Sequence, residues 1–89
     1  MITQEIKITN RLGLHARPAA MLVQTASNFS CDIKIIKETV QVDAKSIMGV
    51  LMLAAEYGST LQFQFNGADE TQAAQAVAAL FENKFNEEY

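Results

Sequence analysis

A strict alternation of apolar and polar residues over Thr60–Asn66 constrains the fold of this chain more than any other pattern. The apolar side chains of Leu61, Phe63 and Phe65 would face one side of a strand, and the glutamines between them the other. Residues 2–9 alternate in the same way, which indicates a second half-buried strand. Strands with one polar face are typical of an antiparallel sheet covered on one side only, and they exclude an all-helical fold.

The other segments complete a regular succession of strands and helices. Residues 16–27 have helical spacing, residues 32–37 and 39–43 are rich in β-forming residues, and an apolar run over residues 47–55 follows Ser46. With a last helix, the predicted order is β-α-β-β-α-β-α. We therefore expect a single domain over residues 1–89, of class α+β, in which three helices cover the apolar face of a four-stranded antiparallel sheet.

Residues with capping or stop character are expected at the helix ends. Ser46 and Asp69 would be N-caps, and Gln72 follows Asp69 by three residues, as in a capping box. Asn28 and Gly58 are expected to end the first two helices. The core-facing stripes predicted for the first and last helices are Ala19, Leu22, Val23 and Ala26, and Ala73, Val77, Leu80 and Phe81.

Charge is unevenly distributed along the chain. Residues 1–45 hold six Lys or Arg and four Asp or Glu, whereas residues 46–89 hold one Lys and six Asp or Glu, for a net charge of −3. This balance argues against a nucleic-acid binder and predicts an anion site in the basic half. The single cysteine, Cys31, is interpreted as a small buried residue. Without a leader or a long apolar run, we expect a cytoplasmic protein that does not associate with membranes.

The only histidine, His15, lies in the run Gly13–Pro18, Gly-Leu-His-Ala-Arg-Pro. A small residue and a proline suit the first turn of a helix, so His15 should lie at a helix N-terminus. The backbone amides of Ala16 and Arg17, the helix dipole and the Arg17 guanidinium would then surround the imidazole. This predicts a phosphate site built around a nucleophile, with a structural or surface histidine as the alternative. A metal site is not expected, because there is no second histidine and Cys31 lies in another element. No cofactor is expected.

The residues flanking this run have structural interpretations. Pro18 is expected to fix the start of the helix whatever His15 does. Asn10 and Arg11 are interpreted as ordinary loop residues, with a role in shaping the loop under His15 as the alternative.

The segment Leu12–Ala19 resembles the active-site motif of the histidine-containing phosphocarrier (HPr) family of the bacterial phosphotransferase system. Lys45–Val50 is similar to the second signature of that family, and Gly67–Glu70 to the start of its last helix. The resemblance implies an open-faced β-sandwich. It also implies that Nδ1 of His15 accepts a phosphoryl group from enzyme I, which uses phosphoenolpyruvate, and passes it to enzyme IIA domains. Arg17 would stabilise the phosphate, and the protein would be a relay rather than a self-contained enzyme.

Ser46 has two interpretations. As an N-cap, its hydroxyl would satisfy a helix amide, which contributes about 1 kcal/mol. The resemblance implies that some family members are phosphorylated at this position by an ATP-dependent kinase, and the added charge weakens phosphate acceptance and partner docking.

The helix after Ser46 is apolar on nearly all sides, so part of it should be exposed in a two-layer domain. We predict that this part forms a docking surface around His15, together with the face of the first helix that carries Met21. Methionine suits a surface that meets several partners in turn, and such a relay is best served by a monomer. Burial of the whole helix is the alternative. The predicted contact residues are Ile47, Met48 and Leu51, with Ala20 and Gln24 opposite.

Two other functions compete with a phosphate relay. An acyl carrier protein is disfavoured because Lys45 precedes Ser46 where that family has an aspartate, and because of the alternating strand. A regulatory docking protein of the same fold is disfavoured because His15 and Arg17 are both present. Within the family, residues 78–85 are similar to nitrogen-branch members, whereas residues 46–49 are similar to kinase-regulated ones.

Overall fold

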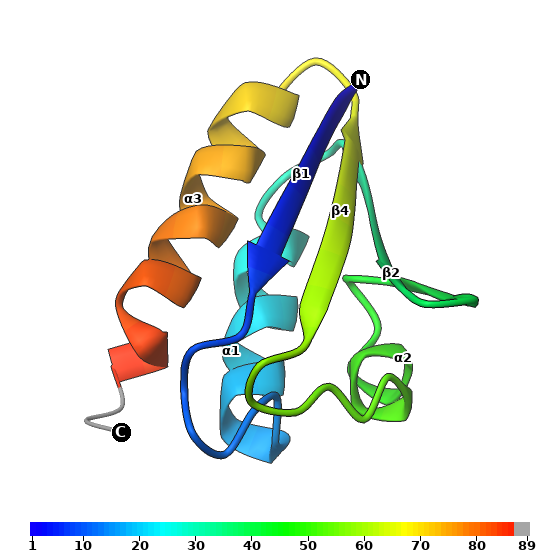
Figure 1. Ribbon diagram of the computed structural model, residues 1–89. Helices are drawn as coiled ribbons and strands as arrows, with labels where there is room; N and C mark the ends of the chain where they lie inside the picture. The colour runs from blue at the N-terminus through cyan, green and yellow to red at the C-terminus, as the bar shows by residue number, and fades with distance from the viewer. Residues whose placement is uncertain (87–89) are drawn as a thin grey trace.

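The computed structural model describes residues 1–86. Four strands form one antiparallel sheet in the order β1-β4-β2-β3, and three helices lie on one side of it (Figure 1). The predicted α+β class and the order β-α-β-β-α-β-α are confirmed. The elements are β1 (Ile2–Lys7), α1 (Ala16–Ser27), β2 (Asp32–Lys37), β3 (Val40–Asp43), α2 (Ile47–Met52), β4 (Thr60–Asn66), α3 (Glu70–Glu82) and a short 3-10 turn, η1 (Lys84–Asn86).

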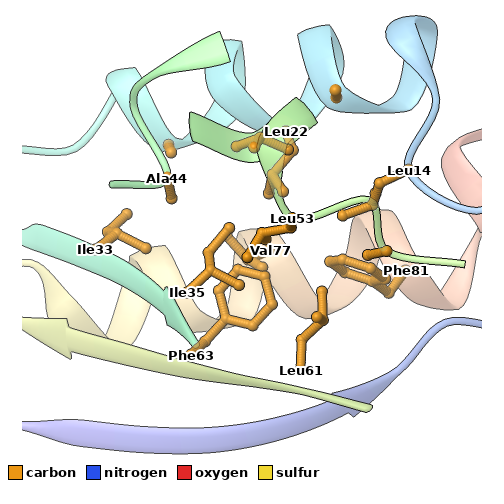
Figure 2. Close-up of a cluster of buried hydrophobic side chains, with 14 of the residues drawn as sticks. Leu14, Leu22, Ile33, Ile35, Ala44, Leu53, Leu61, Phe63, Val77 and Phe81 are labelled. Atoms are coloured by element: carbon orange, nitrogen blue, oxygen red, sulfur yellow. The ribbon is translucent and has the colours of Figure 1, made fainter. Parts of the chain in front are cut away.

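The core fills the space between the sheet and the helices. The three apolar side chains of β4 have no exposed surface, because β4 lies between β1 and β2 and faces the helices. Figure 2 shows Phe63 and Ile35 of the sheet beneath Leu22 of α1 and Val77 of α3. The rings of Phe63 and Phe81 meet edge to face, with centroids 5.7 Å apart. The predicted stripes are buried except for Val23 and Leu80, which are partly exposed and pack against the core.

The opposite face of the sheet is open to solvent. The alternation read from the sequence places Thr3 of β1, Gln64 of β4 and Lys34 of β2 on this face, paired in register across the three strands. Lys34 is exposed, as the prediction of a sheet covered on one side only requires. The fold is therefore open-faced, and every helix-borne group lies on the covered side.

Three predicted boundaries are wrong, one of them the start of β3, which lies at Val40 rather than at residue 39. β1 ends at Lys7 rather than at residue 9. α2 ends at Met52, because Ala54 takes a left-handed φ of 49° and the chain turns so that Leu53 and Ala55 enter the core. Gly58 therefore ends no helix. It lies in the turn before β4, where its N–H donates to the carbonyl of Ile8 at 2.9 Å.

The predicted capping box at the start of α3 is also wrong. Asp69 is the N-cap residue, but its side chain does not cap the helix and instead accepts hydrogen bonds from the N–H groups of Ser30 (2.8 Å) and Cys31 (2.9 Å). Glu70 fills the local role by accepting from the N–H of Gly67 at 3.1 Å, and Gln72 is exposed. Asp69 thus ties the loop before β2 to α3. Cys31 is buried, as expected.

Candidate functional site

His15 is the N-cap residue of α1. Its backbone is extended (φ −75°, ψ −175°), and its carbonyl accepts the first helical hydrogen bond, from the N–H of Ala19 at 2.9 Å. The side chain is half-buried and does not cap the helix. The predicted position at a helix N-terminus is confirmed. Because His15 is only partly buried, a reactant can still reach it.

The first turn of α1 is open to an anion. Ala16 and Arg17 are both exposed, and this turn carries no acidic side chain. Pro18 is buried and has no amide hydrogen, so its position in the turn leaves no donor without a partner. A helix N-terminus combines unpaired N–H groups with the positive end of the dipole. The structure therefore places His15 at a helix N-terminus, with the exposed Arg17 two residues further along the chain. These residue types suit a phosphate group.

The loop before His15 is held by a buried asparagine. Asn10 is 1% exposed, and its Nδ2 donates to the carbonyl of Gly13 at 2.7 Å. Gly13 has a φ of 65°, and its N–H donates back to the carbonyl of Asn10 at 3.1 Å. The interpretation of Asn10 as an ordinary loop residue is therefore wrong, and the alternative, that it shapes the loop under His15, describes the structure. Arg11 is exposed. Asparagine before a glycine turn is the sequence signal for this arrangement.

A second contact fixes the same loop from the other side of the site. The N–H of Leu14 donates to the carbonyl of Ala55 at 2.9 Å, which joins the loop to the segment that follows α2. Lys37 donates from Nζ to the carbonyl of Leu53 at 3.2 Å and thereby supports that segment. These partners are distant in sequence, and no local pattern would have identified them.

Ser46 is the N-cap residue of α2, as predicted. Its Oγ accepts a hydrogen bond from the N–H of Gly49 at 3.1 Å, and the side chain remains partly exposed. The structural interpretation of Ser46 is therefore confirmed. A partly exposed hydroxyl is also sterically open to modification, so the regulatory interpretation stays a prediction.

An apolar surface, defined by Ile47, Met48, Leu51 and Met52 of α2, lies beside α1. These side chains are 38%, 66%, 39% and 72% exposed, so the predicted exposure of this helix is confirmed. Sequence reasoning missed Met52, although it follows Met48 by four residues and so shares its face of the helix. On α1, which contacts α2, Ala20 and Gln24 are exposed, whereas Met21 packs against the core, contrary to expectation.

Within residues 1–86, no three His, Cys, Asp or Glu side chains are grouped so that they could hold a metal ion. Over the same residues, no helix has both the length and the apolar character needed to cross a bilayer.

Comparisons with known proteins agree with this geometry. The family model described as the PTS HPr component phosphorylation site matches residues 2–83. The phosphocarrier protein HPr of Treponema pallidum is 48% identical over 88 residues, which cover 99% of this chain and 100% of that protein. That of Cupriavidus necator is 49% identical over 87 residues, 98% of each chain. The crystal structure of an HPr from Thermoanaerobacter tengcongensis covers 100% of both chains with 46% identity and a TM-score of 0.96. The chain therefore belongs to the HPr family of phosphocarriers of the phosphotransferase system.

Proposed function

We propose that His15 is the residue that accepts the phosphoryl group, and that Arg17 and the backbone amides of Ala16 and Arg17 bind the phosphate. The observation that carries this proposal is the position of a partly exposed His15 at the N-terminus of α1, before a first turn without acidic side chains. Family membership implies enzyme I as the donor and enzyme IIA domains as acceptors. It thereby supports a relay over a docking protein that passes no phosphate on.

The chemistry needs little from the protein beyond position and charge. The lone pair of Nδ1 attacks the phosphorus, while the bond from phosphorus to the donor breaks and its electron pair stays with enzyme I. The attacking nitrogen must be unprotonated, so the remaining ring proton is held on Nε2. The arriving phosphoryl oxygens bring negative charge, which the Arg17 guanidinium and the helix N-terminus offset. The same steps in reverse order deliver the group to an enzyme IIA domain.

Phosphorylation with purified enzyme I and phosphoenolpyruvate tests the acceptor. We expect an acid-labile gain of one phosphoryl mass that His15→Ala abolishes while the far-ultraviolet circular dichroism stays unchanged. A stable phosphorylated product of His15→Ala would refute the assignment. Enzyme IIA is then added to the isolated phosphoprotein. Transfer of the label identifies a relay, and retention identifies a docking protein.

The role of Arg17 requires a charge-matched control. We expect Arg17→Ala to lower the rate of phosphoryl acceptance about tenfold or more, because one donor to the developing charge is lost. Lys34→Ala removes the same charge from the open face of the sheet, away from the helices, and should leave the rate within about twofold. Equal rates for the two variants would show that Arg17 contributes only to net charge.

The apolar surface of α2 is proposed as the partner-docking site, with Ala20 and Gln24 of α1 on its other side. Its support is the exposure of Met48 on α2, which contacts α1, the helix whose N-cap residue is His15. Met48→Glu should raise the KM for enzyme I about tenfold with little change in kcat, since a docking residue contributes binding but no chemistry. A fall in kcat with an unchanged KM would contradict a docking role.

Ser46 is proposed as a regulatory phosphorylation site at the edge of this surface. Its hydroxyl directly precedes Ile47 and Met48, so a phosphate would bring two negative charges to an apolar docking site. Ser46→Asp keeps an N-cap acceptor and adds a charge, whereas Ser46→Ala loses the cap and adds none. Weaker enzyme I binding by Ser46→Asp alone is the expected result. Equal binding by the two variants would argue against charge regulation.

We also propose a domain organisation, an oligomeric state, a location and a branch of the family for this protein. A single domain is supported by the extent of the match, over residues 2–83. We further propose that the protein is a monomer, because successive partners must reach one face. We also propose that it works in the cytoplasm. Membership of the nitrogen branch is supported by residues 78–85, which are similar to that group. Presenting the phosphoprotein with enzyme IIA domains of the sugar and nitrogen branches tests this, and faster transfer to a sugar-specific domain would overturn it.

A further inference from the structure

We propose that Asn10 is a positioning residue for phosphoryl transfer: its side-chain amide fixes the orientation of the Gly13 peptide and thereby the place of the His15 ring at the start of α1. This inference rests on the proposed role of His15 as acceptor.

Asn10 contacts Gly13 through both its backbone and its side chain. The Asn10 carbonyl accepts from the N–H of Gly13 at 3.1 Å, and Nδ2 of Asn10 donates to the Gly13 carbonyl at 2.7 Å. The second bond is short and buried, since Asn10 is 1% exposed and Gly13 is also buried. Water cannot readily replace a donor there, so the side chain determines the direction of the Gly13 carbonyl.

The position of His15 depends on that carbonyl. Gly13 and Leu14 share a peptide plane, and one more peptide bond leads to His15. The N–H of Leu14 belongs to the same plane as the Gly13 carbonyl and donates to the Ala55 carbonyl at 2.9 Å. The C=O and N–H groups of a trans peptide point in opposite directions, so the two hydrogen bonds hold opposite edges of this rigid plane. Loss of one lets the plane rotate and carries His15 away from the amides of Ala16 and Arg17.

An asparagine is chemically specific at this position. The contact with Gly13 needs a donor, because the atom it meets is a carbonyl oxygen. An aspartate has the same shape but, when ionised, only accepts hydrogen bonds, so it would repel that oxygen. An aliphatic residue would leave the buried carbonyl without this donor. Serine retains a donor on a shorter side chain and should restore part of the contact.

The test measures phosphorylation of the full chain by enzyme I and phosphoenolpyruvate, with rates expressed per folded protein. We expect Asn10→Ala and Asn10→Asp to lower kcat about tenfold or more, since a small displacement of a nucleophile has effects of this size. The KM for enzyme I should stay within about twofold, because the α2 surface is untouched. Asn10→Ser should recover part of kcat. Val77→Ala, a buried truncation in α3, is the stability control and should keep kcat within about twofold.

Each outcome decides the proposal. An unchanged kcat in folded Asn10→Asp, or an equal loss in Val77→Ala, reduces Asn10 to a stabilising residue and overturns it. If Asn10→Ala does not fold, the order of kcat between Asn10→Ser and Asn10→Asp decides, and equal values contradict a donor role. Nuclear magnetic resonance should show displaced His15 ring signals and Ala16 amide signals in Asn10→Asp, but not in Val77→Ala. Failure of the acceptor role itself would appear separately, as phosphorylation of His15→Ala.

Discussion

Replacement of Gly13 by alanine tests how tightly the His15 loop is held. Gly13 has a φ of 65°, where a Cβ atom costs about 1 kcal/mol. That Cβ would lie 2.4 Å from the Ala55 carbonyl oxygen and 2.9 Å from Cα of Glu56. Both are backbone atoms, so the two segments must separate. Overpacking and a weakened bond from the N–H of Leu14 to Ala55 add about 2 kcal/mol. The expected total is about 3 kcal/mol, or roughly 12 to 24 °C in Tm for a chain of this size.

Gly58→Ala is the matched control for this substitution. Gly58 also has a positive φ, 87°, but nothing lies within 4 Å of the position that its Cβ would take. Its cost should therefore be the conformational part alone, about 1 kcal/mol. Thermal and urea unfolding of both variants, followed by circular dichroism, gives the difference directly. A Gly13→Ala variant no less stable than Gly58→Ala would refute the inferred close approach of the two loops.

Three further predictions concern other parts of the fold. The hydrogen bond from the N–H of Ser30 contributes most to lowering the pKa of Asp69, and Cys31 contributes less. The Asp69 carboxylate therefore stabilises the protein above its unfolded pKa of about 4. This stabilisation is lost as the pH falls through the lower pKa of the folded state. Asp69→Asn should lower the Tm at neutral pH and reduce its decline in acid; an unchanged acid profile would contradict this. Ser46→Ala should cost about 1 kcal/mol in urea unfolding by removing the acceptor for the N–H of Gly49, and a neutral effect would rule out a capping contribution. Ala54→Gly should raise stability by about 0.5 kcal/mol, because relief of the left-handed φ of 49° slightly exceeds the entropy that glycine loses. A lower Tm for Ala54→Gly would show that this backbone is not strained.

Local patterns were enough to predict most of the fold. The alternation over Thr60–Asn66 matches β4 residue for residue, and helical spacing after His15 matches α1. These elements are predictable because side-chain periodicity directly reports which face is buried. The N-cap role of Ser46 was predictable for a similar reason, since the hydroxyl and the Gly49 amide are three residues apart.

The wrong predictions concern residues whose contacts are made with segments distant in the sequence. Aspartate commonly caps helices, but the backbone N–H groups of Ser30 and Cys31 donate to the Asp69 carboxylate instead. The apolar run after Ser46 has helical character up to Ala55, yet α2 stops at Met52 because Leu53 and Ala55 find more burial in the core. In each case a tertiary contact outweighs a local preference.

The same distinction between local spacing and tertiary contacts applies to the candidate site. The sequence alone was enough to place His15 and the first turn that carries Arg17 at one helix N-terminus, because neighbours in a first turn are neighbours in space. The way in which that histidine is held depends on tertiary contacts, since Asn10 is buried by the fold and the Ala55 carbonyl accepts from the N–H of Leu14 from beyond α2. The reason is physical: hydrogen bonds within one turn follow from the spacing of residues, whereas burial and contacts across the sheet and helices exist only once the core has formed.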